Sequence, residues 1–276
     1  MNSQQELIIE AGRTERHYWA DIWRYRELFF FLAWRDILVR YKQTVIGVAW
    51  AFIRPVITIV VFTFVFGKIA KLPSEGEAPY VIMVCAAMLP WQFFANAFTE
   101  AGNSLISNSN MISKVYFPRI IVPGSATVVC FVDFLISGSI LVALMLFYGF
   151  WPDWRILTLP LFIILAIAAA IGGGLWVAAL NVKYRDFRYI VPFIVQIGIY
   201  ISPIGFSSSI IPEKWRLLYS LNPMVGVIDG FRWAILGGSV SLNWEGIILS
   251  SLLVTVILLS GVAYFRKTEK TFADVI

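Results

Sequence analysis

The sequence predicts an all-α integral membrane protein with six transmembrane helices, an N-terminal amphipathic interface helix and short re-entrant helices before the last span. Its composition is the first observation: of 276 residues 59% are hydrophobic and 14% charged, and the mean hydropathy is +0.77. Soluble domains carry about 25% charged residues, and disordered chains are poor in aromatic residues, so both classes are excluded. The second observation is that the apolar residues form runs of membrane-crossing length.

Six apolar stretches supply these runs. A helix needs about 20 mostly apolar residues to cross about 30 Å of hydrocarbon. We therefore expect spans near residues 46–67, 80–101, 120–149, 156–180, 189–209 and 246–265. The organisation that follows is a cytoplasmic N-terminal segment (1–45), a transmembrane domain (46–265) and a cytoplasmic tail (266–276).

The N-terminal segment contains a helix of another kind. Aromatic and apolar side chains recur at helical spacing between residues 19 and 41, among them Trp19, Trp23, Phe30 and Trp34, while charged residues occupy much of the rest. This pattern is typical of a helix that lies in the plane of the membrane interface.

The distribution of basic residues predicts the orientation. If both termini are cytoplasmic, the inner segments hold 15 of the 22 Lys and Arg residues and the outer segments hold 6. Cytoplasmic loops are enriched in Lys and Arg, so we place both ends in the cytoplasm. The net charge of +5 then reflects membrane orientation and requires no nucleic-acid partner.

Motifs of enzymes are absent from the sequence. It has no G-x-x-x-x-G-K-[ST] segment, so ATP binding of the P-loop kind is excluded. One histidine, His17, and two cysteines offer too few ligands for a metal site, and no Ser-His-Asp triad can be built. Gly172, Gly173 and Gly174 lie in an apolar run and predict close helix packing. We expect no catalytic residue and no metal site in this chain.

Several short segments carry a family resemblance. They are residues 40–50 with Arg54-Pro55, 89–94, 103–106, 112–119, 184–189, 221–224 and 230–232. In this order, and at these places on the predicted topology, they resemble the membrane subunit of ABC-2-type exporters of the O-antigen and capsule class. The similarity extends over most of the chain, from about Trp19 to Phe265.

This resemblance implies the function and the partners. Such permeases form homodimers and engage two copies of a separate ABC ATPase, which binds ATP and Mg, so the chain itself needs no cofactor. They sit among membrane lipids and move undecaprenyl-pyrophosphate-linked polysaccharide across the bacterial inner membrane. Alternatives are export of teichoic acid, capsule or a small amphiphile, and, more distantly, a membrane-embedded lipid-carrier glycosyltransferase.

Two predicted cytoplasmic loops are candidates for contact with the ATPase. The loop 103–119 has an apolar turn that can insert into a groove and basic residues that can meet acidic ones, and the loop 183–188 offers a second contact. The candidate residues are Ile112, Val115, Tyr116, Lys114, Arg119, Arg185 and Asp186. The alternative is that both loops are ordinary turns that carry positive charge.

The substrate path has candidates in the first two spans. Arg54 can contact the lipid pyrophosphate, or it can pair with Glu100 inside the protein. Trp50, Trp91 and Phe94 offer rings on which a glycan can slide, although Trp also marks membrane interfaces. Asp133, an acid within a span, is expected to be a helix–helix hydrogen-bonding partner rather than a proton carrier.

Before the last span, the segment 207–243 is too long for a turn and too apolar for a solvated loop. It predicts two short helices, 210–219 and 223–236, divided by Asn222 and Pro223, and helices buried at membrane depth are tolerated when they are surrounded by protein. By resemblance they form a periplasmic gate, and the alternative is a plain extracellular lid. The gate candidates are Trp215, Tyr219, Asn222, Pro223 and Arg232.

Overall fold

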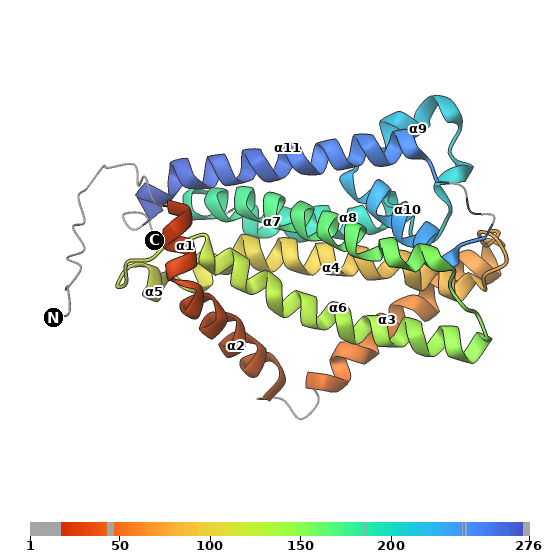
Figure 1. Ribbon diagram of the computed structural model, residues 1–276, viewed down its shortest axis with the longest axis horizontal. Helices are drawn as coiled ribbons and strands as arrows, with labels where there is room; N and C mark the ends of the chain where they lie inside the picture. Colours follow the sequence, from red (N-terminus) through yellow and green to blue (C-terminus); the bar gives the residue numbers. More distant parts are fainter. Residues whose placement is uncertain (1–17, 43–46, 185, 239, 241, 273–276) are drawn as a thin grey trace.

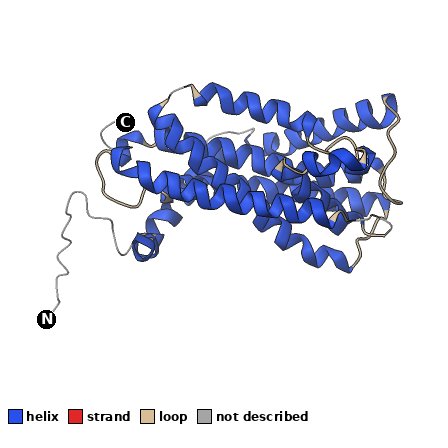
Figure 2. Ribbon diagram, turned by 90° about the horizontal axis from the view of Figure 1, so that it is seen from above, coloured by secondary structure: helices blue, strands red, loops and turns tan. Residues whose placement is uncertain are grey.

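The computed structural model describes residues 18–42, 47–184, 186–238, 240 and 242–272. These residues form helices and connecting turns, and no strand occurs among them (Figure 2). The long helices run side by side along one axis and form an elongated bundle (Figure 1).

Five of the described helices are long and apolar enough to cross a membrane, and they coincide with five of the six predicted spans. Each bilayer-length run becomes a helix because only a helix satisfies its own backbone hydrogen bonds in hydrocarbon. They are α3 (Gly47–Phe62) with its π-helical continuation η1 (Thr63–Ile69), α4 (Tyr80–Ser107), α6 (Ile121–Tyr148), α7 (Leu159–Lys183) after the turn η2 (Trp154–Thr158), and α11 (Trp244–Thr268).

The fifth predicted span is shorter than the sequence pattern indicates. The helix α8 (Phe187–Ile201) has 15 residues and ends well before residue 209. Ser202 adopts an extended conformation, with φ −79° and ψ 152°. It precedes Pro203, and a proline disfavours the helical conformation of the residue before it. At about 1.5 Å per residue, α8 is about 22 Å long, so irregular chain completes this segment.

The N-terminal helix forms as α1 (Tyr18–Arg24) and α2 (Arg26–Lys42). The second of these lies obliquely against α6 on the outside of the bundle (Figure 1). Leu32 and Ala33 are buried, whereas Phe30, Phe31 and Trp34 are exposed. Exposed aromatic side chains of this kind suit the boundary between lipid and water.

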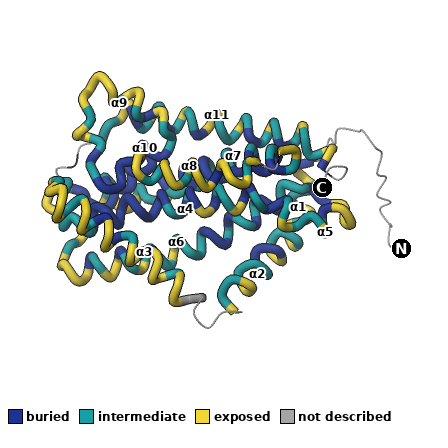
Figure 3. The backbone as a smooth tube through the Cα atoms, turned by 180° about the vertical axis from the view of Figure 1, so that it is seen from behind, coloured by how far each residue is buried: buried dark blue, intermediate teal, exposed yellow. Residues whose placement is uncertain are grey.

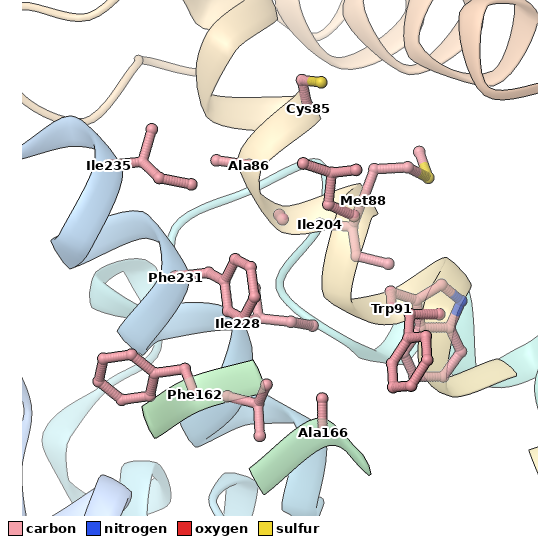
Figure 4. Packing of buried hydrophobic residues seen from close by; sticks show 14 of the residues in the cluster. Cys85, Ala86, Met88, Trp91, Phe162, Ala166, Ile204, Ile228, Phe231 and Ile235 are labelled. Carbon is pink, nitrogen blue, oxygen red and sulfur yellow. The ribbon is translucent and has the colours of Figure 1, made fainter. Parts of the chain in front are cut away.

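The central helix of the bundle is α4, which contacts α7, α6 and a shorter helix, α10 (Pro223–Leu236). Small residues such as Ala86 and Ala166 let these helices approach closely, and larger side chains including Phe162 and Phe231 fill the remaining space (Figure 4). At Gly172 an added Cβ would lie 2.6 Å from the Leu258 Cα atom. The predicted close packing at this glycine is therefore confirmed, between α7 and α11.

The two short helices predicted before the last span are present. The turn η3 (Ser208–Ile210) and α9 (Glu213–Tyr219) precede α10, and the Asn222 side chain caps α10 by accepting a hydrogen bond from the Met224 N–H at 3.0 Å. Most of α10 is buried, whereas α9 is exposed (Figure 3). Both helices lie at the end of the bundle opposite α1.

Candidate functional site

The coupling-loop candidates surround the short helix α5 (Ser109–Ile112), at the end of the bundle near α1 (Figure 1). Ile112 is buried in an apolar cluster with Leu105 and Phe117 and does not point outward as an inserting residue would. Val115 is 56% exposed and Tyr116 48% exposed, and Lys114 is exposed beside them. The surface that this loop offers to a partner is therefore residues 114–116.

Arg119 is engaged within the chain. Its backbone N–H donates to Glu269 Oε1 at 2.7 Å, and its guanidinium donates to the backbone carbonyl of Glu269. The hydroxyl of Tyr18 donates to Glu269 Oε2 at 2.9 Å. Sequence reasoning expected Arg119 to meet an acid of another subunit, and it missed Glu269, which lies 150 residues away in the chain.

The second predicted contact, the loop 183–188, lies at the same end of the bundle. The amide of Asn181, at the end of α7, donates to the Gly102 carbonyl of α4 at 2.8 Å, which brings the ends of these helices together. Asp186 is exposed at the start of α8. Arg185 lies outside the described residues.

The entrance candidates Trp50 and Arg54 are exposed on α3. Among the described side chains, the cation that pairs with Glu100 is Arg40, at 4.0 Å, so the predicted Arg54–Glu100 pair is wrong. The physical reason is the oblique course of α2 against α6, which brings Arg40 in its last turn to Asp133 of α6 and within 4.0 Å of Glu100 of α4. The guanidinium of Arg54 thus remains at the surface.

Asp133 is confirmed as a helix–helix partner. Its Oδ2 lies 3.2 Å from Arg40 Nη1, and its Oδ1 accepts a hydrogen bond from the Tyr41 hydroxyl. Burial and this hydrogen bond both raise the pKa of Tyr41, so the phenol keeps the proton that it donates. An acid in the middle of α6 therefore anchors the last turn of α2, and the ion pair offsets the cost of placing a carboxylate in a span.

Trp91 and Phe94 pack inside the chain. Trp91 is 5% exposed, and a Cβ added at Gly198 of α8 would lie 2.4 Å from its ring. The ring centroids of Trp91 and Phe94 are 5.8 Å apart. Figure 4 shows Trp91 among the residues of the buried apolar cluster. The structure therefore differs from the expected channel lining at Trp91, whose ring fills the contact between α4 and α8.

Two gate candidates hold the last residue of α8 and the start of the segment 202–206 that follows it. The Tyr219 hydroxyl donates to the Ile201 carbonyl at 2.7 Å, and the Asn222 amide donates to the Ser202 hydroxyl at 3.0 Å. Pro223 is the first residue of α10, where its missing N–H costs no helical hydrogen bond. Trp215 differs from the others because it is exposed on α9.

Arg232 holds the rest of that segment. Its guanidinium donates to the carbonyls of Ile204 and Phe206, each at 2.8 Å, and its Nη1 lies 3.4 Å from Glu75 Oε1. The side chain of Arg232 is 0% exposed. A buried charge needs a partner, and Glu75 supplies it from the loop before α4. Sequence reasoning identified Arg232 but not Glu75.

Comparison with known proteins gives relatives that cover most of the chain. The family model described as ABC-2 type transporter matches residues 27–236. The chain is 28% identical to an O-antigen export system permease protein RfbA of Klebsiella pneumoniae, over 88% of this chain and 92% of that protein. It is 24% identical to RfbA of Myxococcus xanthus, over 92% of this chain and 97% of that protein. It is 22% identical to the polysialic acid transport protein KpsM of Escherichia coli, over 86% of this chain and 91% of that protein.

Proposed function

Because this chain belongs to the ABC-2 type transporter family, we propose that it is the membrane-spanning permease of an ABC exporter of lipid-linked polysaccharide. The observation that carries the proposal is the similarity to O-antigen export permeases along nearly the whole length of both chains. The substrate is a polysaccharide on an undecaprenyl-pyrophosphate carrier, moved outward across the bacterial inner membrane. Its hydrophilic glycan and apolar anchor require a protein path through the bilayer.

The energy for export comes from a separate ATPase. Two copies bind ATP and Mg and engage a homodimer of the permease, which itself holds no nucleotide. The wide apolar face of α3 and its continuation η1 supports the dimer: Trp50 and Ile57 of α3 and Phe64 of η1 are exposed on it. A second copy of the chain would cover this face and enclose a path between the two protomers.

The ATPase docks at the end of the bundle that holds α1 and α5. The helix α1 and the C-terminal end of α11 both lie at that end (Figure 1). The excess of Lys and Arg in the segments predicted to be cytoplasmic supports placing it in the cytoplasm. Val115, Tyr116 and Lys114 make the main contact, and the loop with Arg185 and Asp186 makes a second.

Arg54 binds the pyrophosphate of the lipid carrier. Its guanidinium is at the surface of α3, since Glu100 is paired with Arg40, and a guanidinium matches phosphate oxygens in a bidentate geometry. At the opposite end, α9 and α10 form the periplasmic gate over the exit. The Tyr219, Asn222 and Arg232 contacts give this gate a defined closed position against residues 201–206.

Capsular polysaccharide is the second candidate substrate. The similarity to a relative named as a polysialic acid transport protein favours it over teichoic acid or a small amphiphile. Both candidates share the same requirement for an extended path that accepts sugar rings.

Deletion of the gene tests the proposal. Surface polysaccharide should disappear while lipid-linked polymer accumulates on the cytoplasmic side, and the purified chain alone should hydrolyse no ATP. A deletion strain with normal surface polysaccharide and no internal polymer would overturn the substrate assignment. Specific ATP hydrolysis by the isolated chain would overturn the proposal that a separate subunit hydrolyses the ATP.

A further inference from the structure

Two segments from distant parts of the chain meet at Glu269, in the turn η4 (Glu269–Thr271) after α11. Its two carboxylate oxygens accept from the Arg119 backbone N–H and from the Tyr18 hydroxyl. Its carbonyl accepts from the Arg119 guanidinium. Hydrogen bonds in which one partner is ionised are roughly twice as strong as neutral ones. This junction therefore ties α1, the end of the exposed loop 113–116 and the C-terminal turn together.

Apolar packing holds the same three parts. Phe265 and Phe272 flank the turn η4, both are buried, and their ring centroids are 5.3 Å apart. They belong to the apolar cluster that contains Ile112 and Phe117, the residues on either side of the exposed loop. Both ends of the loop are thus fixed against the C-terminal turn, while its middle faces outward.

Arg266, in the last turn of α11, also contacts Tyr18. The guanidinium of Arg266 lies 4.4 Å from the ring centroid of Tyr18. A cation over an aromatic face is attracted to it, so this contact adds to the Tyr18–Glu269 hydrogen bond. Loss of the Glu269 side chain would release one attachment of α1 and the hydrogen bond from the Arg119 backbone N–H.

We propose that Glu269 is a positioning residue: it holds the loop 113–116 in the conformation in which residues 114–116 meet the ATPase. This inference rests on the proposed docking function of that loop. A loop that is already held in its bound conformation loses less conformational entropy when its partner binds. The C-terminal turn thereby becomes part of the energy-coupling apparatus without touching the ATPase.

The test compares three variants of the full permease assembled with its ATPase. Glu269→Ala removes both carboxylate acceptors, and the affinity for the ATPase should fall about tenfold, which corresponds to 1.4 kcal/mol. Glu269→Gln keeps an acceptor for the Arg119 N–H and should recover most of that affinity. Lys270→Ala, an exposed neighbour, should match the wild type. A purely local stabilising role would lower membrane abundance without this selective loss and rescue.

A second measurement uses the permease alone. Trypsin should cleave after the exposed Lys114 several times faster in Glu269→Ala than in the wild type or in Lys270→Ala. If Glu269→Ala does not accumulate in the membrane, Glu269→Asp takes its place, because the shorter side chain keeps the charge but withdraws the carboxylate from the Arg119 N–H. Faster cleavage in Glu269→Asp supports the proposal, and an unchanged rate overturns it.

The double variant Lys114→Ala with Tyr116→Ala tests the docking function of the loop separately from the positioning role of Glu269. If it loses ATPase binding while Glu269→Ala binds like the wild type, docking stands and the positioning role is overturned. If the double variant keeps wild-type affinity, the docking function of the loop fails, and the positioning role falls with it.

Discussion

Arg232 on α10 lies 3.4 Å from Glu75 in the loop before α4, although 157 residues separate them in the chain. The same guanidinium donates to two carbonyls of the segment after α8, so one fully buried side chain joins three parts of the chain at the end of the bundle opposite α1. The position of α10 therefore depends on a charge that cannot be removed without leaving polar groups unpaired.

Substituting Arg232 should destabilise the protein strongly. Arg232→Ala leaves the Glu75 carboxylate and the carbonyls of Ile204 and Phe206 without their donor, and breaking a buried ion pair costs about 3–5 kcal/mol. We expect low abundance in the membrane and a lower unfolding temperature in detergent. Trp215→Ala is the matched control, because Trp215 is exposed on the neighbouring helix α9. Equal unfolding temperatures for the two variants would contradict the anchoring role of Arg232.

Two glycines provide a paired test of helix packing. A Cβ at Gly172 would lie 2.6 Å from backbone atoms of α11, whereas a Cβ at Gly138 would meet nothing within 4 Å. Gly172→Ala should therefore cost about 1–3 kcal/mol through overpacking, and Gly138→Ala should be neutral or slightly stabilising. Thermal unfolding of the two purified variants measures the difference. Similar stability in both would show that α7 and α11 can separate without cost.

Arg54 and Arg40 should respond differently to the same substitution. Arg40→Ala removes the ion pair to Asp133, so the free energy of unfolding should fall by about 1–2 kcal/mol. Arg54→Ala removes an exposed side chain, so stability and abundance should be normal while polysaccharide export falls. Arg54→Lys keeps the charge and should retain part of the export. Normal export in Arg54→Ala would remove the proposed phosphate contact.

The sequence alone predicts the parts of the fold that depend on local pattern. Bilayer thickness fixes the length of an apolar helix, so five spans were predictable, and Asn222-Pro223 marks the start of α10 because both residues favour a helix N-terminus. Ser202-Pro203 likewise carried the signal for the early end of α8. Contacts between distant segments were not predictable: neither Glu75 nor Glu269 is marked by any motif. The periodicity of the sequence also does not give the tilt of α2. That tilt brings Arg40 close to Glu100.

The predicted orientation can be tested with reporters. With both termini in the cytoplasm, a reporter active only in the periplasm should give no signal when it is fused after Ile276. The same reporter inserted near Ser74, in the loop before α4, should be active, because that loop lies at the end of the bundle opposite α1. A signal from the C-terminal fusion would invert the assignment of the docking and gate ends.

The last prediction concerns the exposed loop 113–116. Lys114→Ala combined with Tyr116→Ala should leave folding intact, because both side chains are exposed and the buried Ile112 and Phe117 still hold the loop. An aromatic anchor that fills a pocket of a partner contributes about 2 kcal/mol or more, and that loss lowers affinity about thirtyfold. Less ATPase should therefore co-purify with the variant, and surface polysaccharide should fall at normal permease abundance. The matched control is Lys214→Ala with Trp215→Ala, an exposed pair of similar chemistry at the opposite end of the bundle, which should leave co-purification unchanged. Equal co-purification of the ATPase with both double variants would reduce the loop 113–116 to a turn that carries positive charge.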